Sequence, residues 1–237
     1  MPNYRLSIPA ENVSTVEPID FDSMSALLKK NYNKYSNYFK VASENSNIDL
    51  SILISFSFSL SGIGENPGTY VDLTKGLIPW NLNFAPSFLK TEYDLQRLNE
   101  NEKSIFKKYG IKFTKKGTTR VLTRADQLNA ELNILIGSII IGQLLDNIYE
   151  GAKDSLIWNA NIDGVLRIDR IYAMYLLTAY QPLEYKLPSE VDKIRKDKST
   201  TPFEFVSFGE KNNLYWYRGV KNLIGKNGFF EIVLKTI

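Results

Sequence analysis

The first two thirds of the chain alternate irregular stretches with stretches of helical spacing. Residues 1–22 hold three prolines and no sustained periodicity, so the sequence predicts an extended N-terminal arm. Asp22 or Ser23 can cap a helix over about 24–43, where apolar residues recur at broadly helical intervals. Three further segments have patterns typical of helices: 91–109, 125–149 and 166–181. Residues 112–123 predict a short hairpin or loop that turns at Lys116-Gly117.

The segment 50–61 carries two competing patterns. Its large apolar residues, among them Phe56 and Phe58, alternate with serines, which is the period of a half-buried strand. In a helix the same apolar residues occupy two neighbouring faces, and a helix buried on all sides accepts that distribution and its serines. The pattern alone leaves both structures open.

After Pro182 the chain changes character. Residues 183–200 are charged and predict a linker, and residues 201–237 predict an antiparallel β-meander with turns at Asn212-Asn213 and Asn227-Gly228. The strands of this meander are expected at 203–208, 213–220 and 229–236. We expect the arm and the meander to be contact surfaces for other subunits, because neither buries enough apolar surface alone. The chain is therefore predicted to be mainly α, and α+β overall.

Composition narrows the chemistry that the chain can perform. The 237 residues can bury one core, and the net charge of +3 is too small to favour a nucleic-acid partner. The absence of cysteine and histidine excludes disulfides, thiolate chemistry, histidine triads and the usual zinc ligands, and we expect neither metal nor cofactor. The longest apolar run, residues 134–142, is shorter than the roughly 18–20 residues of a membrane span.

Three short motifs occur in a telling order. Leu60-Ser61-Gly62 ends the apolar segment and is followed by Gly76-Leu77; Asn133-Ile134-x-x-Gly137 opens a later apolar stretch; Ala173-Met174-Tyr175 comes last. Together they resemble the lysozyme-like domain of the soluble lytic transglycosylase family, over roughly residues 25–182. The resemblance implies a helical domain over 23–182, in which helices at 49–61 and 126–148 pack against each other.

The resemblance also marks where the chemistry departs from the family pattern. In that family the apolar helix ends in Glu-Ser-Gly, and the glutamate protonates the glycosidic oxygen. Leu60 stands at the matching position and has no proton to donate, so it is a degenerate catalytic position. Leu176 and Thr178 likewise replace an asparagine and a glycine of the third motif. These departures argue against inheritance of the activity.

A few residues remain candidates for a site. Glu65 is the carboxylate nearest to the degenerate position and would serve as the general acid if burial raised its pKa; the alternative is a solvated loop residue. Tyr70, Gly76, Trp80 and Tyr175 would line a saccharide groove, although large aromatics also serve as core packing. Seven basic residues between Lys103 and Arg120 suit either an anionic polymer or a solvated helix end.

Three functions fit these observations. The first is a structural or cell-wall-contacting component of a phage particle, whose partners are other subunits of a virion or envelope-penetrating assembly and peptidoglycan; the lysine-, asparagine- and isoleucine-rich composition suits a phage genome. The virion is then the expected location, with the cell envelope or cytoplasm before assembly. The second is an active peptidoglycan lytic enzyme that uses Glu65. The third is an unrelated helical scaffold or binding protein.

Overall fold

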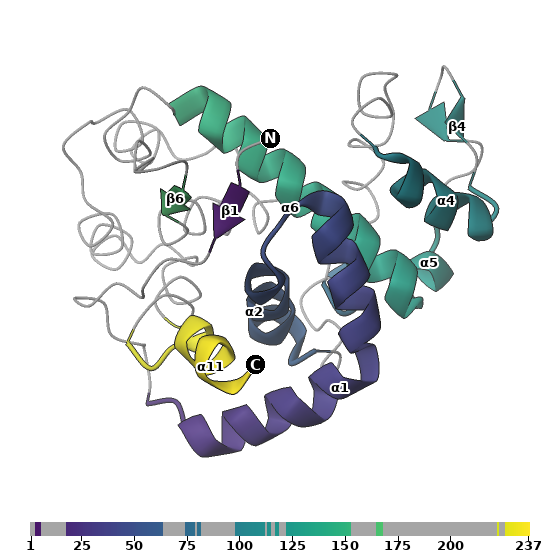
Figure 1. Cartoon of the computed structure of the whole chain (residues 1–237). Helices are drawn as coiled ribbons and strands as arrows, with labels where there is room; N and C mark the ends of the chain where they lie inside the picture. Colours follow the sequence, from purple (N-terminus) through teal and green to yellow (C-terminus); the bar gives the residue numbers. More distant parts are fainter. Residues whose placement is uncertain are drawn as a thin grey trace.

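Figure 1 shows the computed structural model of the chain. The structure describes residues 3–5, 18–63, 74–78, 80–81, 98–111, 113–114, 117–118, 122–152, 165–167, 222 and 226–237. This part of the chain is mainly helical, as the sequence predicted, with strands of only two or three residues. In the described residues no helix is both long enough and apolar enough to cross a bilayer.

Helix α1, Phe21–Ser46, forms one side of the core. Its N-cap is Asp20, whose carboxylate accepts hydrogen bonds from the Ser23 amide at 3.1 Å and the Ser23 hydroxyl at 2.7 Å. The predicted caps Asp22 and Ser23 are therefore wrong, because both lie inside the helix. The predicted arm loses its last two residues to α1, and near its start strand β1, Asn3–Arg5, pairs with β6, Val165–Arg167, in parallel. The predicted helix 166–181 is wrong at its first two residues, which belong to β6.

Helix α2, Leu50–Ser61, settles the competition between helix and strand. Every side chain from Ile52 to Phe58 is at most 3% exposed. A half-buried strand would need one face exposed to solvent, and this segment has no such face. The Asp49 carboxylate accepts the Ser51 amide at 2.8 Å and begins the helix, and Gly62 ends it. Of the serines in this segment, Ser57 and Ser61 form hydrogen bonds within the core.

The middle of the chain follows the predicted order with one break. Asn129 separates two helices where the sequence predicted one, and its side chain accepts the Leu132 amide at 3.0 Å. A hairpin lies between the helix Glu100–Lys108 and this pair, in the region 112–123 where the sequence predicted a hairpin or loop. The elements are α4, Glu100–Lys108; β4, Phe113–Thr114; β5, Gly117–Thr118; α5, Arg124–Leu128; and α6, Ala130–Ala152. A second hairpin joins β2, Thr74–Lys75, to β3, Trp80–Asn81.

The C-terminal segment contradicts the predicted meander. Residues Phe229–Thr236 form helix α11 instead of a strand, and the predicted strands at 203–208 and 213–220 lie outside the described residues. Asn227-Gly228 is a helix entry here, because the Asn227 amide donates to the Glu231 carboxylate at 2.6 Å and Gly228 is the N-cap. Aromatic and β-branched residues suggested a strand, yet Phe230 and Val233 are three residues apart and share a helical face.

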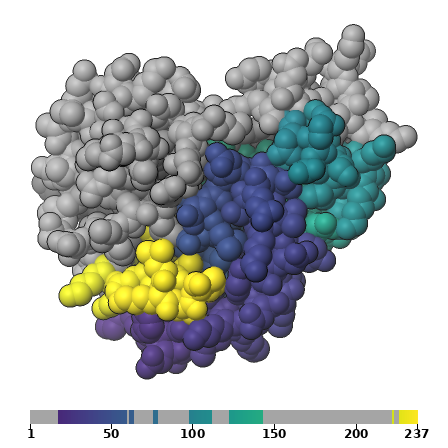
Figure 2. Space-filling view, viewed as in Figure 1, coloured from purple at the N-terminus to yellow at the C-terminus, as the bar shows by residue number. Residues whose placement is uncertain are grey.

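The helices enclose one core with α2 at its centre. In Figure 1, α1 bends around α2, α6 crosses α1, and α11 lies beside α1 and α2. Figure 2 shows α11 lying against the surfaces of α1 and α2. Phe230, Ile232 and Val233 are at most 1% exposed, and the Phe229 ring meets the Phe58 ring edge-on at 5.2 Å. Part of the predicted contact surface at residues 201–237 thus lies in the chain's own core, namely Phe230, Ile232 and Val233.

Both helices expected at 49–61 and 126–148 are present, as α2 and the α5–α6 pair. The prediction that these two helices pack directly against each other is wrong. The main neighbours of α2 are α1 and α11, and those of α6 are α1 and α5. Residues 76–78 lie between α2 and α6 and bond to both. This inserted segment defines the candidate site.

Candidate functional site

The first two of the three sequence motifs meet at one place, which we call the α2–α6 junction. It consists of Ser57 and Ser61 from α2, the segment Gly76-Leu77-Ile78, and Asn133 and Gly137 from α6. Each of these residues is buried. Side chains of α2 and α6 form hydrogen bonds with the backbone of the segment 76–78.

On the α2 side, two serines hold one carbonyl. The Ser57 hydroxyl donates to the Leu77 carbonyl oxygen at 2.6 Å. The Ser61 hydroxyl shares its one proton between the same oxygen, at 2.7 Å, and the Ser57 carbonyl oxygen, at 2.9 Å. A carbonyl oxygen accepts two hydrogen bonds, so both fit. Residues 57 and 61 are four apart and therefore lie on one face of α2. The serine alternation that suggested a strand in fact places two hydroxyls against one buried carbonyl.

On the α6 side, Asn133 holds the next peptide. Its Oδ1 accepts the Ile78 amide at 2.8 Å, and Asn133 is fully buried. Gly76 lies in a left-handed conformation with φ of +113°. A Cβ atom there would come within 2.0 Å of the Asn133 Nδ2 atom and 2.7 Å of the Gln127 carbonyl oxygen. Both the conformation and the space therefore require glycine at this position.

The Ile78 side chain packs directly against the backbone of α6 at Gly137. A Cβ atom on Gly137 would lie 2.7 Å from the Cβ and Cγ2 atoms of Ile78. The close neighbour at Gly137 is the Ile78 side chain, and the Ser138 hydroxyl bonds within its own helix, to the Leu135 carbonyl at 2.8 Å.

Helix α1 fixes the exit from α2. The Asn31 side chain donates from Nδ2 to the Gly62 carbonyl at 2.9 Å, and Asn31 is buried. Ile63 follows with φ of 54°, which is uncommon for a β-branched residue, and its side chain is 1% exposed. The chain thus leaves α2 through a constrained turn that points Ile63 into the core.

The other candidate residues divide into two groups. Leu60 lies in the last turn of α2, next to Ser61, and the backbone of Trp80 pairs with Lys75 in the β2–β3 hairpin. Glu65, Tyr70 and Tyr175 lie outside the described residues, as do Leu176 and Thr178. The structure therefore brings Gly76 together with the motif residues of α2 and α6 and does not address the catalytic role of Glu65.

The junction has no acid of its own. Its polar groups are hydroxyls, one amide and backbone peptides, and none of its side chains ionises. Asp126 is a carboxylate next in sequence to Gln127, whose carbonyl oxygen lies near Gly76 of the junction. The Oδ2 atom of Asp126 accepts hydrogen bonds from the Thr123 amide at 2.7 Å and the Thr123 hydroxyl at 2.9 Å. Protonation of a glycosidic oxygen needs a carboxyl group with a raised pKa. The side chains of the junction hold the backbone of residues 76–78 in place, and none of them is a carboxyl group.

A carboxyl group with a raised pKa is found elsewhere. Burial raises the pKa of Glu102 to about 7, and its side chain belongs to a residue only 4% exposed. Glu102 belongs to the capping box of α4, whose Asn99 side chain bonds to the last turn of α1. Among the described residues, no hydrogen bond joins Glu102 to a residue of the junction. The Asn99-x-x-Glu102 spacing of a capping box was the signal for it in the sequence.

The basic run at 103–120 is partly neutralised. Lys103 pairs with Glu100 at 2.7 Å, and Lys108 pairs with Glu131, which also accepts the Tyr109 hydroxyl. Lys112, Lys115, Lys116 and Arg120 lie outside the described residues. The described end of the run thus contacts the chain's own carboxylates, as a solvated helix end does.

Neither metal chemistry nor a known family is indicated by the remaining findings. Within the described ranges no three acidic side chains gather as they would to hold a metal ion. No family model matches the chain, and no curated protein matches its sequence.

Proposed function

We propose that the chain is a lysozyme-like domain of the transglycosylase type, degenerate at its catalytic acid, that acts as a structural, cell-wall-contacting component of a phage particle. The observation that supports this most is the α2–α6 junction. Ser61, Gly76-Leu77 and Asn133 belong to motif segments that are far apart in the sequence, and they are neighbours in space.

The contacts at the junction depend on residue type. Only a hydroxyl or another donor at position 61 bonds the Leu77 carbonyl, only a side chain with an acceptor at 133 bonds the Ile78 amide, and only glycine fits at 76. A chance match of motifs in unrelated helices has no reason to bring these residues together. The junction therefore favours the transglycosylase-like fold over an unrelated scaffold.

The α2–α6 junction also supports a fold that is retained without catalytic activity. Leu60 occupies the position of the acid, one residue before Ser61 at the end of α2. The hydrogen bonds that hold the segment 76–78 need no carboxylate, so the domain keeps its architecture without one. A domain of this kind suits contact with a glycan rather than its cleavage. Assignment to a phage particle rests on composition and on the type of domain.

Binding to purified peptidoglycan sacculi tests the proposal. The chain should co-sediment with sacculi, and Trp80→Ala and Tyr175→Ala should each weaken the binding several-fold, because aromatic side chains of the groove stack on sugar rings. Tyr35→Ala is the matched control: this half-buried tyrosine lies on α1, outside the junction, and its loss should leave binding unchanged.

Circular dichroism of every variant separates lost binding from lost folding. A folded wild-type chain that stays in the supernatant at all sacculus concentrations would contradict wall contact. Equal losses in the groove variants and in Tyr35→Ala would contradict the location of the groove.

A further inference from the structure

Glu102 lies in the first turn of α4, whose N-cap residue Asn99 bonds to the last turn of α1, and α4 itself packs on α6. Its carboxylate accepts the Asn99 amide at 2.8 Å, and its own amide donates to the Asn99 side chain at 2.9 Å. The Asn99 Nδ2 atom donates in turn to the Asn45 carbonyl in the last turn of α1, at 2.7 Å. Four residues on, Phe106 is fully buried where α4 packs on α6. The first turn of α4 is thus joined to the core through the capping box.

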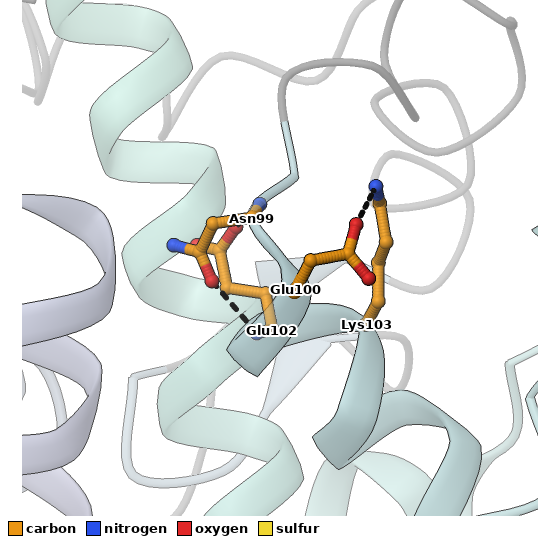
Figure 3. A network of polar contacts seen from close by, with 4 residues as sticks. All are labelled: Asn99, Glu100, Glu102 and Lys103. Atoms are coloured by element: carbon orange, nitrogen blue, oxygen red, sulfur yellow. Dashed lines mark hydrogen bonds and ion pairs between the residues drawn. The ribbon is translucent and has the colours of Figure 1, made fainter.

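This buried carboxylate has no direct cationic partner among the described residues. Figure 3 shows Lys103 directed to Glu100, at 2.7 Å, while Glu102 faces Asn99. The neighbouring turn of α1 presents Asn45, which is neutral. On α6, Glu131 is taken up by Lys108 and Tyr109 at the other end of α4. Lys103 is the charged group that acts on Glu102, and it does so at a distance.

Two effects oppose each other at Glu102. The Asn99 bond and the charge of Lys103 favour the carboxylate, as does the N-terminus of a helix in general. Burial disfavours it and is the larger effect, so the pKa rises to about 7. In an opened first turn the group would meet water and return toward its ordinary pKa of 4.5. Opening is therefore coupled to loss of the proton.

We propose that Glu102 is a proton-controlled pin: as a neutral acid it holds the first turn of α4 against α1 and α6, and as a carboxylate it favours release of that turn. This device is independent of the proposed function. It governs α4 and the β4–β5 hairpin that follows it in the chain, and it operates between mildly acidic and neutral pH.

Amide hydrogen exchange of the full-length chain tests the pin. Between pH 5 and pH 8, after correction for intrinsic exchange rates, protection of the α4 amides should fall by roughly tenfold or more, as expected for a pKa that differs by more than one unit between the two states. Protection of the α2 amides should fall no more than global stability does. In Glu102→Gln, which keeps the capping geometry without a charge, α4 protection should not vary with pH.

Two further arms make the result decisive. Glu100→Gln, an exposed acid in the same turn, should retain the wild-type pH dependence. Carbon-13 NMR of the Glu102 carboxyl should show a titration near pH 7, where the fall in α4 protection levels off. This titration remains measurable even if Glu102→Gln folds poorly. The proposal is overturned if α4 protection is constant from pH 5 to pH 8, if Glu102→Gln keeps the wild-type dependence, or if the carboxyl titrates at its ordinary pKa.

Discussion

At the scale of single residues, a few positions of unusual environment hold the molecule together. Gly76 has a conformation and a space that admit no side chain, Asn133 satisfies a buried peptide, and Glu102 is a buried acid. Ser57 and Ser61 show how a misleading pattern arises, since their alternation with apolar residues reflects buried hydroxyl bonds rather than a strand. Such roles depend on neighbours distant in sequence, so the sequence alone indicated Gly76 and Asn133 only through the resemblance.

Gly76→Ala should be strongly destabilising. The new methyl group would collide with the Asn133 side chain and the Gln127 carbonyl, and φ of +113° strains any L-residue, so we expect a loss of about 3 kcal/mol or more. Gly110→Ala is the control, because Gly110 also has positive φ but has no atom within 4 Å of a Cβ position. It should cost about 1 kcal/mol. Urea unfolding monitored by circular dichroism measures both, and equal losses would contradict the close packing at Gly76.

Glu102 should make the whole chain less stable as pH rises. Its folded pKa of about 7 lies above the unfolded value of 4.5, so the folded state holds the proton more tightly. The neutral form's contribution is present below pH 4.5 and is lost as pH rises toward 7, a change of about 1–3 kcal/mol. Glu102→Gln should remove that dependence and be the more stable protein at pH 8, by urea unfolding at several pH values.

Glu231 provides a control of opposite sign. The bond from Lys235 lowers the pKa of Glu231, so its stabilising contribution is present at neutral pH and is lost as pH falls. Glu231→Gln should therefore lower stability at pH 7 and leave the neutral-range dependence due to Glu102 in place. A Glu102→Gln protein with the wild-type pH profile would contradict the assignment.

At the scale of elements, the sequence predicted helices best where a cap and a long periodic segment agree. Helix α6 and the hairpin after α4 were found close to their predicted places. Helix α2 followed from the order of motifs, because periodicity alone favoured neither structure. Helix α11 was missed, since short runs of aromatic and β-branched residues also suit strands and its partners lie almost 200 residues away. Tertiary packing decides such segments.

Helix α11 should therefore be required for the core rather than serve as a detachable contact surface. Phe230→Ala removes a side chain that is 1% exposed between α1 and α2, and it should cost about 3–5 kcal/mol. Leu234→Ala is the control on the same helix, where a 47% exposed side chain should cost less than about 0.5 kcal/mol. Thermal unfolding compares the two. A deletion of residues 229–237 that left the melting temperature unchanged would contradict the packing of α11.

At the scale of the whole molecule, the described helices surround α2, and the first two of the three motifs meet near the end of α2. The resemblance implied a helical domain over 23–182, and it did not anticipate that the C-terminal segment completes the core. The groove residues Tyr70 and Tyr175 and the candidate acid Glu65 lie outside the described residues, so their roles remain predictions. A fold maintained without an acid at position 60 is the central claim.

Release of soluble muropeptides from purified peptidoglycan, measured by chromatography beside an active lysozyme, tests that claim most directly. We predict no release above the buffer control for the wild-type chain, and at most a small fraction of the reference activity for Leu60→Glu, since Leu176 and Thr178 also depart from the family pattern. Loss of a general acid alone typically lowers a rate by about 10²–10⁴-fold. Release by the wild-type chain that Glu65→Gln abolishes would contradict the account and identify the protein as an active lytic enzyme.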